Sequence, residues 1–199
     1  MKHIMLNHVS KHFAVNNILS NSQHGFRQGL STTTQLTSVI HEWSSLLQKC
    51  SQVDVAFLHY RKAFDRVPLQ RLCSKLNYYG IVSDSQNWLM SFLTARKQAV
   101  VVDGSQWSWR DVTSGVPQGS VIGPTLFLLY INDIQDNIQS EIRLFADDWM
   151  VYREICKTNI TRSSSPIFLL VVRLAYELQH QEVCSHVNYA ETHSQHLKN

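Results

Sequence analysis

The chain has 199 residues, of which 44% are hydrophobic, and a formal net charge of +3. This length is sufficient for a domain with a hydrophobic core, and the small positive charge only weakly favours an anionic partner. Four cysteines are scattered without a Cys-x-x-Cys pair, which indicates a reducing compartment or no constraint on the thiols. Neither a signal peptide nor a membrane-spanning apolar run is visible. We therefore expect an intracellular protein with no membrane partner, and the sequence leaves its oligomeric state open.

The first part of the chain predicts two helices and one strand. Residues 2–15 are expected to be helical, and residues 24–29 a loop. Thr32 and Gln35 have the spacing of a capping box, which predicts a helix from residue 32 to about residue 48. The expected apolar face of this helix comprises Leu36, Val39, Ile40, Trp43, Leu46 and Leu47. Residues 53–60 alternate in the manner of a strand.

The middle of the chain predicts helices separated by a hairpin. Pro68 fits the first turn of one helix and Gly80 its end, and Ser83 is expected to cap the next helix. Residues 97–102 and 105–112 flank Asp103-Gly104, a pair typical of a tight hairpin turn. A loop over residues 114–123 is followed by an apolar helix expected from residue 124 to about residue 138.

Two adjacent aspartates, Asp147 and Asp148, lie inside the apolar run of residues 144–152. The run predicts two short strands with the acidic pair at the turn between them. Burying two neighbouring carboxylates is costly, and a divalent cation such as Mg²⁺, which prefers oxygen ligands, offsets that cost. The alternative is a surface turn in which aspartate is simply a good turn former.

Four segments carry a family resemblance by their order and spacing. They are HGFRQGLSTTTQL at 24–36, VDVAFLHYRKAFDRVP at 53–68, GVPQGSVIGP at 115–124 and FADD at 145–148. Together they resemble the reverse transcriptase domain of non-LTR (LINE-type) retrotransposons, over residues 1 to about 154. The resemblance implies an α+β fold, a right-hand polymerase palm in which helices back an antiparallel sheet, with partial fingers and no thumb.

The resemblance also implies a division of the chain into three parts. Residues 1–50 correspond to a partial fingers segment, and residues 51–155 to the palm with its catalytic motifs. Residues 156–199 lose the family pattern, so we expect a degenerate or frame-shifted tail that is poorly ordered. On this view the chain is a copy incomplete at both ends.

The metal site implied by the resemblance centres on the acidic pair. Asp147 and Asp148 match the catalytic carboxylates, which in the family hold two Mg²⁺ ions beside the strand that ends near residue 59. The backbone carbonyl of Tyr60 is a further candidate ligand. The family pattern places an aspartate where this chain has His59. Imidazole is a poor Mg²⁺ ligand and supplies one nitrogen where two carboxylate oxygens are needed to bridge two metals.

Other residues match nucleotide-binding positions of the family. Phe64 matches the aromatic side chain that stacks under the sugar and excludes a 2′-hydroxyl, although a core aromatic is an equally compatible interpretation. Gln118 and Gly119 belong to the Pro-Gln-Gly loop, which supports the incoming nucleotide and template. Arg27 is expected to reach a phosphate or to be an ordinary surface residue.

The functional expectation follows from the family and from its departure at His59. The family is an RNA-directed DNA polymerase, which takes an RNA template, a DNA primer and deoxynucleoside triphosphates. Because a metal-binding aspartate is replaced, this copy is expected to be impaired. The alternative is a catalytically inactive retrotransposon remnant that binds nucleic acid weakly.

Overall fold

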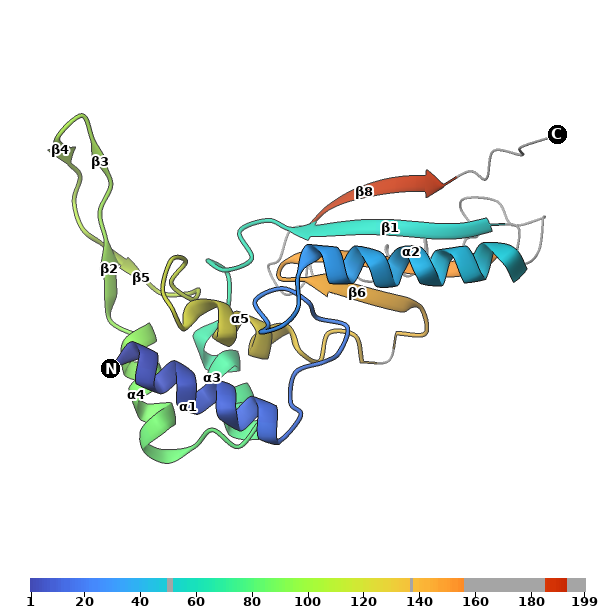
Figure 1. The fold of residues 1–199 in the computed structure, drawn as a ribbon. Helices are drawn as coiled ribbons and strands as arrows, with labels where there is room; N and C mark the ends of the chain where they lie inside the picture. The colour runs from blue at the N-terminus through green and yellow to red at the C-terminus, as the bar shows by residue number, and fades with distance from the viewer. Residues whose placement is uncertain (50–51, 137, 156–184, 193–199) are drawn as a thin grey trace. The chain divides into compact units, whose positions relative to one another are not determined.

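The computed structural model describes residues 1–49, 52–136, 138–155 and 185–192 (Figure 1). The chain forms two compact units. One comprises residues 1–20 and 62–134 and is called the helical unit; the other comprises residues 21–61 and 135–199 and is called the sheet unit. Each unit is therefore built from segments that are far apart in the sequence.

The sheet unit contains a four-stranded antiparallel sheet. Its strand order is β6 (Glu141–Phe145), β7 (Asp148–Ile155), β1 (Gln52–Tyr60) and β8 (Ser185–Thr192). The predicted strand over residues 53–60 is confirmed, and it pairs with the acidic hairpin as the resemblance implied. An antiparallel sheet combined with helices confirms the α+β class.

Helix α2 (Thr32–Lys49) lies along this sheet (Figure 1). Trp43 and Leu46 pack against a cluster formed by Val53, Val55 and Tyr152, with the rings of Trp43 and Tyr152 5.8 Å apart and edge to face. The helix is confirmed, and Val39 is buried as expected, but the expected apolar face is partly wrong, because three of its six side chains are exposed. These are Leu36, Ile40 and Leu47.

The predicted cap of this helix is displaced by one residue. Ser31 Oγ accepts the N–H of Thr34, and Thr34 Oγ1 accepts the N–H of Ser31. This reciprocal pair is a capping box that uses Ser31 and Thr34 rather than Thr32 and Gln35. Gln35, the expected partner in the box, is buried.

The helical unit packs α1 (Lys2–Val15), α3 (Leu69–Tyr78), α4 (Ser83–Leu93) and α5 (Gly123–Ile131). Each helix buries at least two apolar side chains, as the predicted periodicities require. Those of 5% exposure or less include Val9, Phe13, Leu72, Leu76, Leu89, Leu93, Leu126 and Leu129. Nε2 of His12 donates to the carbonyl of Tyr79 at 2.7 Å, which ties α1 to the end of α3.

Two predicted helix boundaries are wrong in this unit. Ser83 makes no capping hydrogen bond, since Val82 occupies the cap position of α4. Helix α5 ends at Ile131 rather than near residue 138. Its end is set by Asn132, whose side chain accepts the N–H of Ser20 at 2.8 Å and donates to the carbonyl of Ile18 at 2.7 Å.

The predicted hairpin is confirmed and has two short ladders. Strand β2 (Arg96–Gln98) pairs with β5 (Arg110–Val112), and β3 (Val101–Val102) pairs with β4 (Ser105–Gln106). Asp103 and Gly104 have φ values of 49° and 78° at the tip. Positive φ at both central residues is what a tight hairpin turn of this type requires.

The expectation of a poorly ordered tail concerns residues 156–199, of which 156–184 and 193–199 lie outside the described residues. Within the tail, Ser185–Thr192 form β8, a strand that the sequence did not predict. Where the chain is described, no helix is both long and apolar enough to cross a membrane.

Candidate functional site

The acidic pair lies at the turn that joins β6 to β7. Phe145 and Asp148 form the last pair of the ladder, so Ala146 and Asp147 make the turn itself. Ala146 has a φ of 55°, a conformation that costs free energy for a residue with a Cβ. The predicted turn is confirmed, with Asp148 as the first residue of β7.

A second segment, residues 22–25, is bound along the end of β6 and is called the strap. The N–H of His24 donates to the carbonyl of Leu144, and the N–H of Leu144 donates to the carbonyl of Ser22, both at 2.8 Å. Gly25 lies against the turn so closely that a Cβ there would be 2.3 Å from the backbone nitrogen of Ala146. Only glycine therefore permits this approach.

Gln23 joins the strap to the acidic turn. Its side-chain Oε1 accepts the N–H of Ala146 at 2.9 Å and the N–H of Gly25 at 2.8 Å. The side chain is deeply buried, with the residue 3% exposed. Because buried amide groups require partners, Gln23 fixes the turn in its left-handed conformation. Gln23 was not among the predicted site residues, and its place directly before the His24-Gly25 motif was the available signal.

His59 faces the acidic pair from the end of β1. It is the register partner of Asp148, and its Nδ1 lies 2.7 Å from Oδ1 of Asp148 and 3.9 Å from Oδ2 of Asp147. A hydrogen bond therefore joins the imidazole to Asp148, and protonation of the ring would make it an ion pair. Three side chains that the sequence singled out are thus brought together in the sheet unit.

These three side chains do not fit a site for two Mg²⁺ ions. The donor set has two carboxylates and one imidazole, whereas Mg²⁺ prefers oxygen ligands in a strict octahedral arrangement. One carboxylate oxygen is already engaged by His59 at hydrogen-bond distance. Across the described ranges, no group of three or more His, Cys, Asp or Glu side chains is placed to hold a metal ion.

Tyr60 and Trp149 lock the ends of β1 and β7 together beside the acidic turn. Their rings meet edge to face with centroids 4.8 Å apart, and both residues are buried. Such a contact stabilises the register that sets His59 opposite Asp148. The suggested metal ligand, the carbonyl of Tyr60, stays a prediction.

Arg27 is half-buried beside the strap. Its Nη1 donates to the carbonyl of Gln23 at 3.4 Å, which joins the guanidinium to the strap. The predicted contact with a phosphate stays a prediction.

The other expected nucleotide-binding residues belong to the helical unit. Phe64 stacks on Phe127 with ring centroids 4.3 Å apart and an interplanar angle of 19°. Gln118 and Gly119 are exposed. The structure therefore divides the predicted site residues between the two units, and the sheet unit holds the acidic pair, His59, Tyr60 and Arg27.

The Pro-Gln-Gly loop is attached to the segment that follows β1. The N–H of Gly115 donates to the carbonyl of Val67, and the N–H of Val116 donates to that of Phe64, both at 2.8 Å. Gly115 has a φ of 84°, and a Cβ there would be 2.6 Å from the carbonyl oxygen of Asp65. Glycine is required at this position for both reasons.

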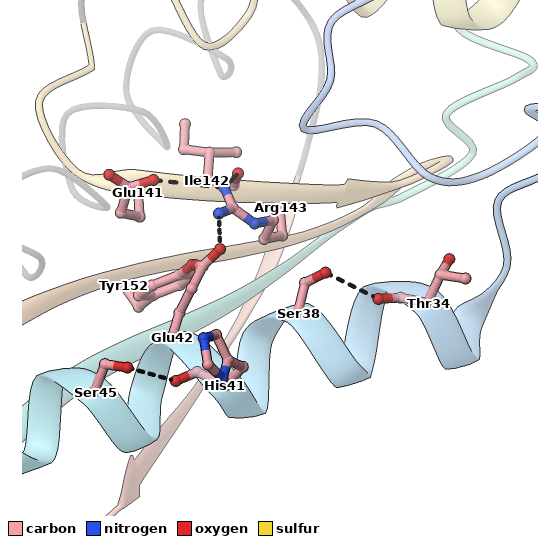
Figure 2. A network of polar contacts seen from close by, with 9 residues as sticks. All are labelled: Thr34, Ser38, His41, Glu42, Ser45, Glu141, Ile142, Arg143 and Tyr152. Carbon is pink, nitrogen blue, oxygen red and sulfur yellow. Dashed lines mark hydrogen bonds and ion pairs between the residues drawn. The ribbon is translucent and has the colours of Figure 1, made fainter.

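A network of polar side chains anchors α2 to the sheet (Figure 2). Glu42 accepts hydrogen bonds from the guanidinium of Arg143 on β6 and from the hydroxyl of Tyr152 on β7. Burial would raise the pKa of Glu42, but these two donors outweigh it and lower the pKa. Burial and the bond to Glu42 raise the pKa of the Tyr152 phenol. The network therefore holds a carboxylate in its charged form against the sheet.

The chain matches one protein family and is similar to several known proteins. Residues 1–176 match the family described as reverse transcriptase (RNA-dependent DNA polymerase). The "Probable RNA-directed DNA polymerase from transposon X-element" of Drosophila melanogaster is 35% identical over 147 residues, which is 68% of this chain and 15% of that protein. The "RNA-directed DNA polymerase from mobile element jockey" of the same species is 33% identical over 161 residues, covering 76% of this chain and 17% of that protein.

Solved structures of low sequence identity share the fold. Telomerase from Candida tropicalis superimposes with a TM-score of 0.70 at 10% identity, covering 96% of this chain and 33% of that one. Telomerase from Candida albicans gives a TM-score of 0.65 at 12% identity, covering 96% and 35%. These likenesses confirm the polymerase palm fold. The chain spans less than a fifth of the length of the transposon relatives and about a third of each telomerase.

Proposed function

Because the chain belongs to the reverse transcriptase (RNA-dependent DNA polymerase) family, we propose that it is a nucleic-acid-binding polymerase domain with impaired nucleotidyl transfer. Its partners would be an RNA template, a DNA primer and deoxynucleoside triphosphates. Family membership and the named relatives support these partners. The reverse transcriptase family uses divalent metal ions. The site residues of this chain are poorly suited to bind them.

One observation carries the proposal of impairment, namely the short contact between His59 and Asp148. The imidazole stands where the family pattern has an aspartate, and its Nδ1 is 2.7 Å from the Asp148 carboxylate. Histidine at position 59 removes a carboxylate that would bridge two metal ions. Its imidazole also forms a hydrogen bond with the remaining carboxylate of Asp148. Because a metal's Lewis-acid role is worth several kcal/mol of transition-state stabilisation, weakened metal binding would slow the reaction severely.

The site residues outside the acidic pair would serve binding rather than chemistry. Asp147 and Asp148 would still be the catalytic and metal-binding carboxylates. Phe64, Gln118, Gly119, Arg27 and the carbonyl of Tyr60 would contact the nucleotide, the template or a metal, as the family pattern implies. Gln23 would hold the acidic turn in place through its two accepted hydrogen bonds.

A second candidate function, residual polymerase activity, is favoured by the ordered acidic turn. The turn keeps both aspartates next to each other at the start of a strand that pairs with β1, as expected. Mn²⁺ accepts imidazole more readily than Mg²⁺ does, so it is the ion with which residual activity would be seen.

Primer extension tests the proposal directly. The purified chain is supplied with poly(rA)/oligo(dT), dTTP and either Mg²⁺ or Mn²⁺, and the products are separated by length. We expect no extension with Mg²⁺. The matched control is Asp147→Asn, which shows whether any product comes from this site or from a contaminating polymerase. Robust Mg²⁺-dependent extension that Asp147→Asn abolishes would refute the proposed impairment, and extension with Mn²⁺ alone would establish the second candidate.

A further inference from the structure

The hairpin of the helical unit presents large apolar side chains to solvent. Trp107 and Trp109 are 69% and 62% exposed. Val100, Val101 and Val102 on the opposite strand are exposed as well. Burying tryptophan is strongly favourable, so two exposed tryptophans on one short hairpin indicate a surface that contacts a partner. Residues 99–109 are called the aromatic hairpin.

The pairing of this hairpin changes register at the tryptophans. Gln98 pairs with Arg110, and Val101 pairs with Gln106. Two residues on the first strand, 99 and 100, therefore face three on the second, 107 to 109. The extra residue is a β-bulge, a feature that re-aims side chains and occurs preferentially near functional sites. The N–H of Trp107 still donates to the carbonyl of Val100 at 2.9 Å, so the bulge follows Trp107.

The base of the hairpin is bound to the Pro-Gln-Gly loop. The guanidinium of Arg96 donates to the carbonyls of Ser114 and Gly115 at 3.0 and 2.6 Å, and to that of Leu93 at 2.8 Å. Both ends of the hairpin are thereby tied to the segment that carries Gln118.

Exposed acidic and basic side chains balance over the hairpin, with Asp103 at its tip and Asp111 opposite Lys97, and the charge next to the tryptophans is the basic Arg110. Arg110 follows Trp109 directly and is exposed, and Lys97 lies one residue along on the paired strand. Lys97 Nζ lies 3.6 Å from Oδ1 of Asp111, and both side chains are exposed. An exposed ion pair of this kind contributes little to stability. Exposed aromatic rings interleaved with basic side chains are the chemistry that binds single-stranded nucleic acid, by stacking on bases and contacting phosphates.

We propose that the aromatic hairpin binds single-stranded nucleic acid, with Trp107 and Trp109 stacking on unpaired bases and Arg110 contacting the backbone. The inference rests on the proposed function for its choice of nucleic acid over protein as the partner. It assigns part of the affinity to a surface outside the acidic turn. Stacking uses the faces of the bases, so binding should depend little on sequence and should not require a metal ion.

The test measures binding of the full chain to a fluorescein-labelled single-stranded RNA of roughly 16 nucleotides, the upper end of known site sizes. Fluorescence anisotropy is recorded in EDTA, so the outcome is independent of whether the chain extends a primer. The double variant Trp107→Ala/Trp109→Ala should bind on the order of tenfold more weakly or worse. The double variant Trp107→Phe/Trp109→Phe should remain within about threefold of the parent, because phenylalanine also stacks.

Tyr78→Ala is the matched control, because this aromatic residue of the same unit is 82% exposed but lies on α3. It should leave the affinity unchanged. Arg110→Gln should reduce the slope of log K against log salt by about one. Single-stranded DNA should bind comparably and duplex RNA more weakly.

Four results would overturn the inference. They are a change below about threefold in the double alanine variant, an equal loss in Tyr78→Ala, a preference for duplex, and no binding of RNA by the parent chain. Sedimentation of the same variants measures self-association. If the double alanine variant no longer self-associates but binds RNA with unchanged affinity, the hairpin does not bind nucleic acid. In that case the hairpin is a protein interface.

Discussion

The substitution Gln23→Ala tests whether the strap positions the acidic turn. In the parent chain the Gln23 Oε1 accepts the N–H groups of Ala146 and Gly25 at 2.9 and 2.8 Å. Alanine removes that acceptor while leaving both donors buried. The turn also loses the bond from Gln23 Nε2 to the carbonyl of Ala146, which at 3.4 Å is weak.

The expected magnitude follows from the two orphaned donors. A buried N–H without a partner costs about 1–3 kcal/mol, so two of them cost about 2–6 kcal/mol of stability for the sheet unit. Water that enters the space left by the side chain satisfies part of this need and brings the value toward the lower end. We therefore expect a loss of about 2–3 kcal/mol.

Urea unfolding and amide hydrogen exchange measure this effect together. Exchange at Ala146 and Gly25 should accelerate far more than at the strands that flank them, because local opening of the turn becomes easier. Gln35→Ala is a control that removes another buried glutamine, from α2. A loss below about 0.5 kcal/mol, with exchange at the turn unchanged, would refute the positioning role.

Three further substitutions test the site and its supports. Without metal, His59→Asp should lower the thermal unfolding midpoint, because it replaces the hydrogen bond to Asp148 with a repulsion between carboxylates. Mg²⁺ should then raise the midpoint of this variant, as scanning fluorimetry would measure. If Mg²⁺ leaves the midpoint unchanged, the argument that His59 weakens metal binding is contradicted. Gly115→Ala should cost at least about 2 kcal/mol in urea, because its Cβ would meet the backbone of Asp65 and the left-handed conformation disfavours alanine. Folding lowers the pKa of Glu42 from 4.5. The contribution of the ionised carboxylate to folding stability is therefore complete above pH 4.5 and is lost as the pH falls through the pKa of the folded state. Glu42→Gln should therefore lower stability at neutral pH and flatten its acid dependence, and parallel pH profiles for parent and variant would show that the network carries no such linkage.

Elements with local chemical signals could be predicted from the sequence. Asp103-Gly104 supplies positive φ at two successive positions, and Gly80 ends α3 with a φ of 79°. The alternation of β1 and the apolar run around the acidic pair likewise follow from neighbouring residues alone. The family motifs extended this to the palm fold, because four segments in order constrain topology far more than any single one.

Elements that end through distant contacts could not be predicted. Helix α5 stops at Ile131 because Asn132 binds backbone groups of Ser20 and Ile18, more than a hundred residues earlier in the chain. Packing against the sheet determines which face of α2 is buried. Leu36 and Ile40 belong to an apolar stripe in sequence but lie on the side that the sheet leaves exposed.

The acidic turn shows most clearly what each level of description decided. By itself, the sequence determined that two aspartates lie at a turn between apolar strands and that a histidine replaces the family's aspartate. Only the tertiary structure decided that His59 engages Asp148 and that Gln23 holds the turn from a separate segment. Local chemistry dictates which residues can form a turn, whereas strand register and hydrogen bonds between distant segments determine which side chains meet there.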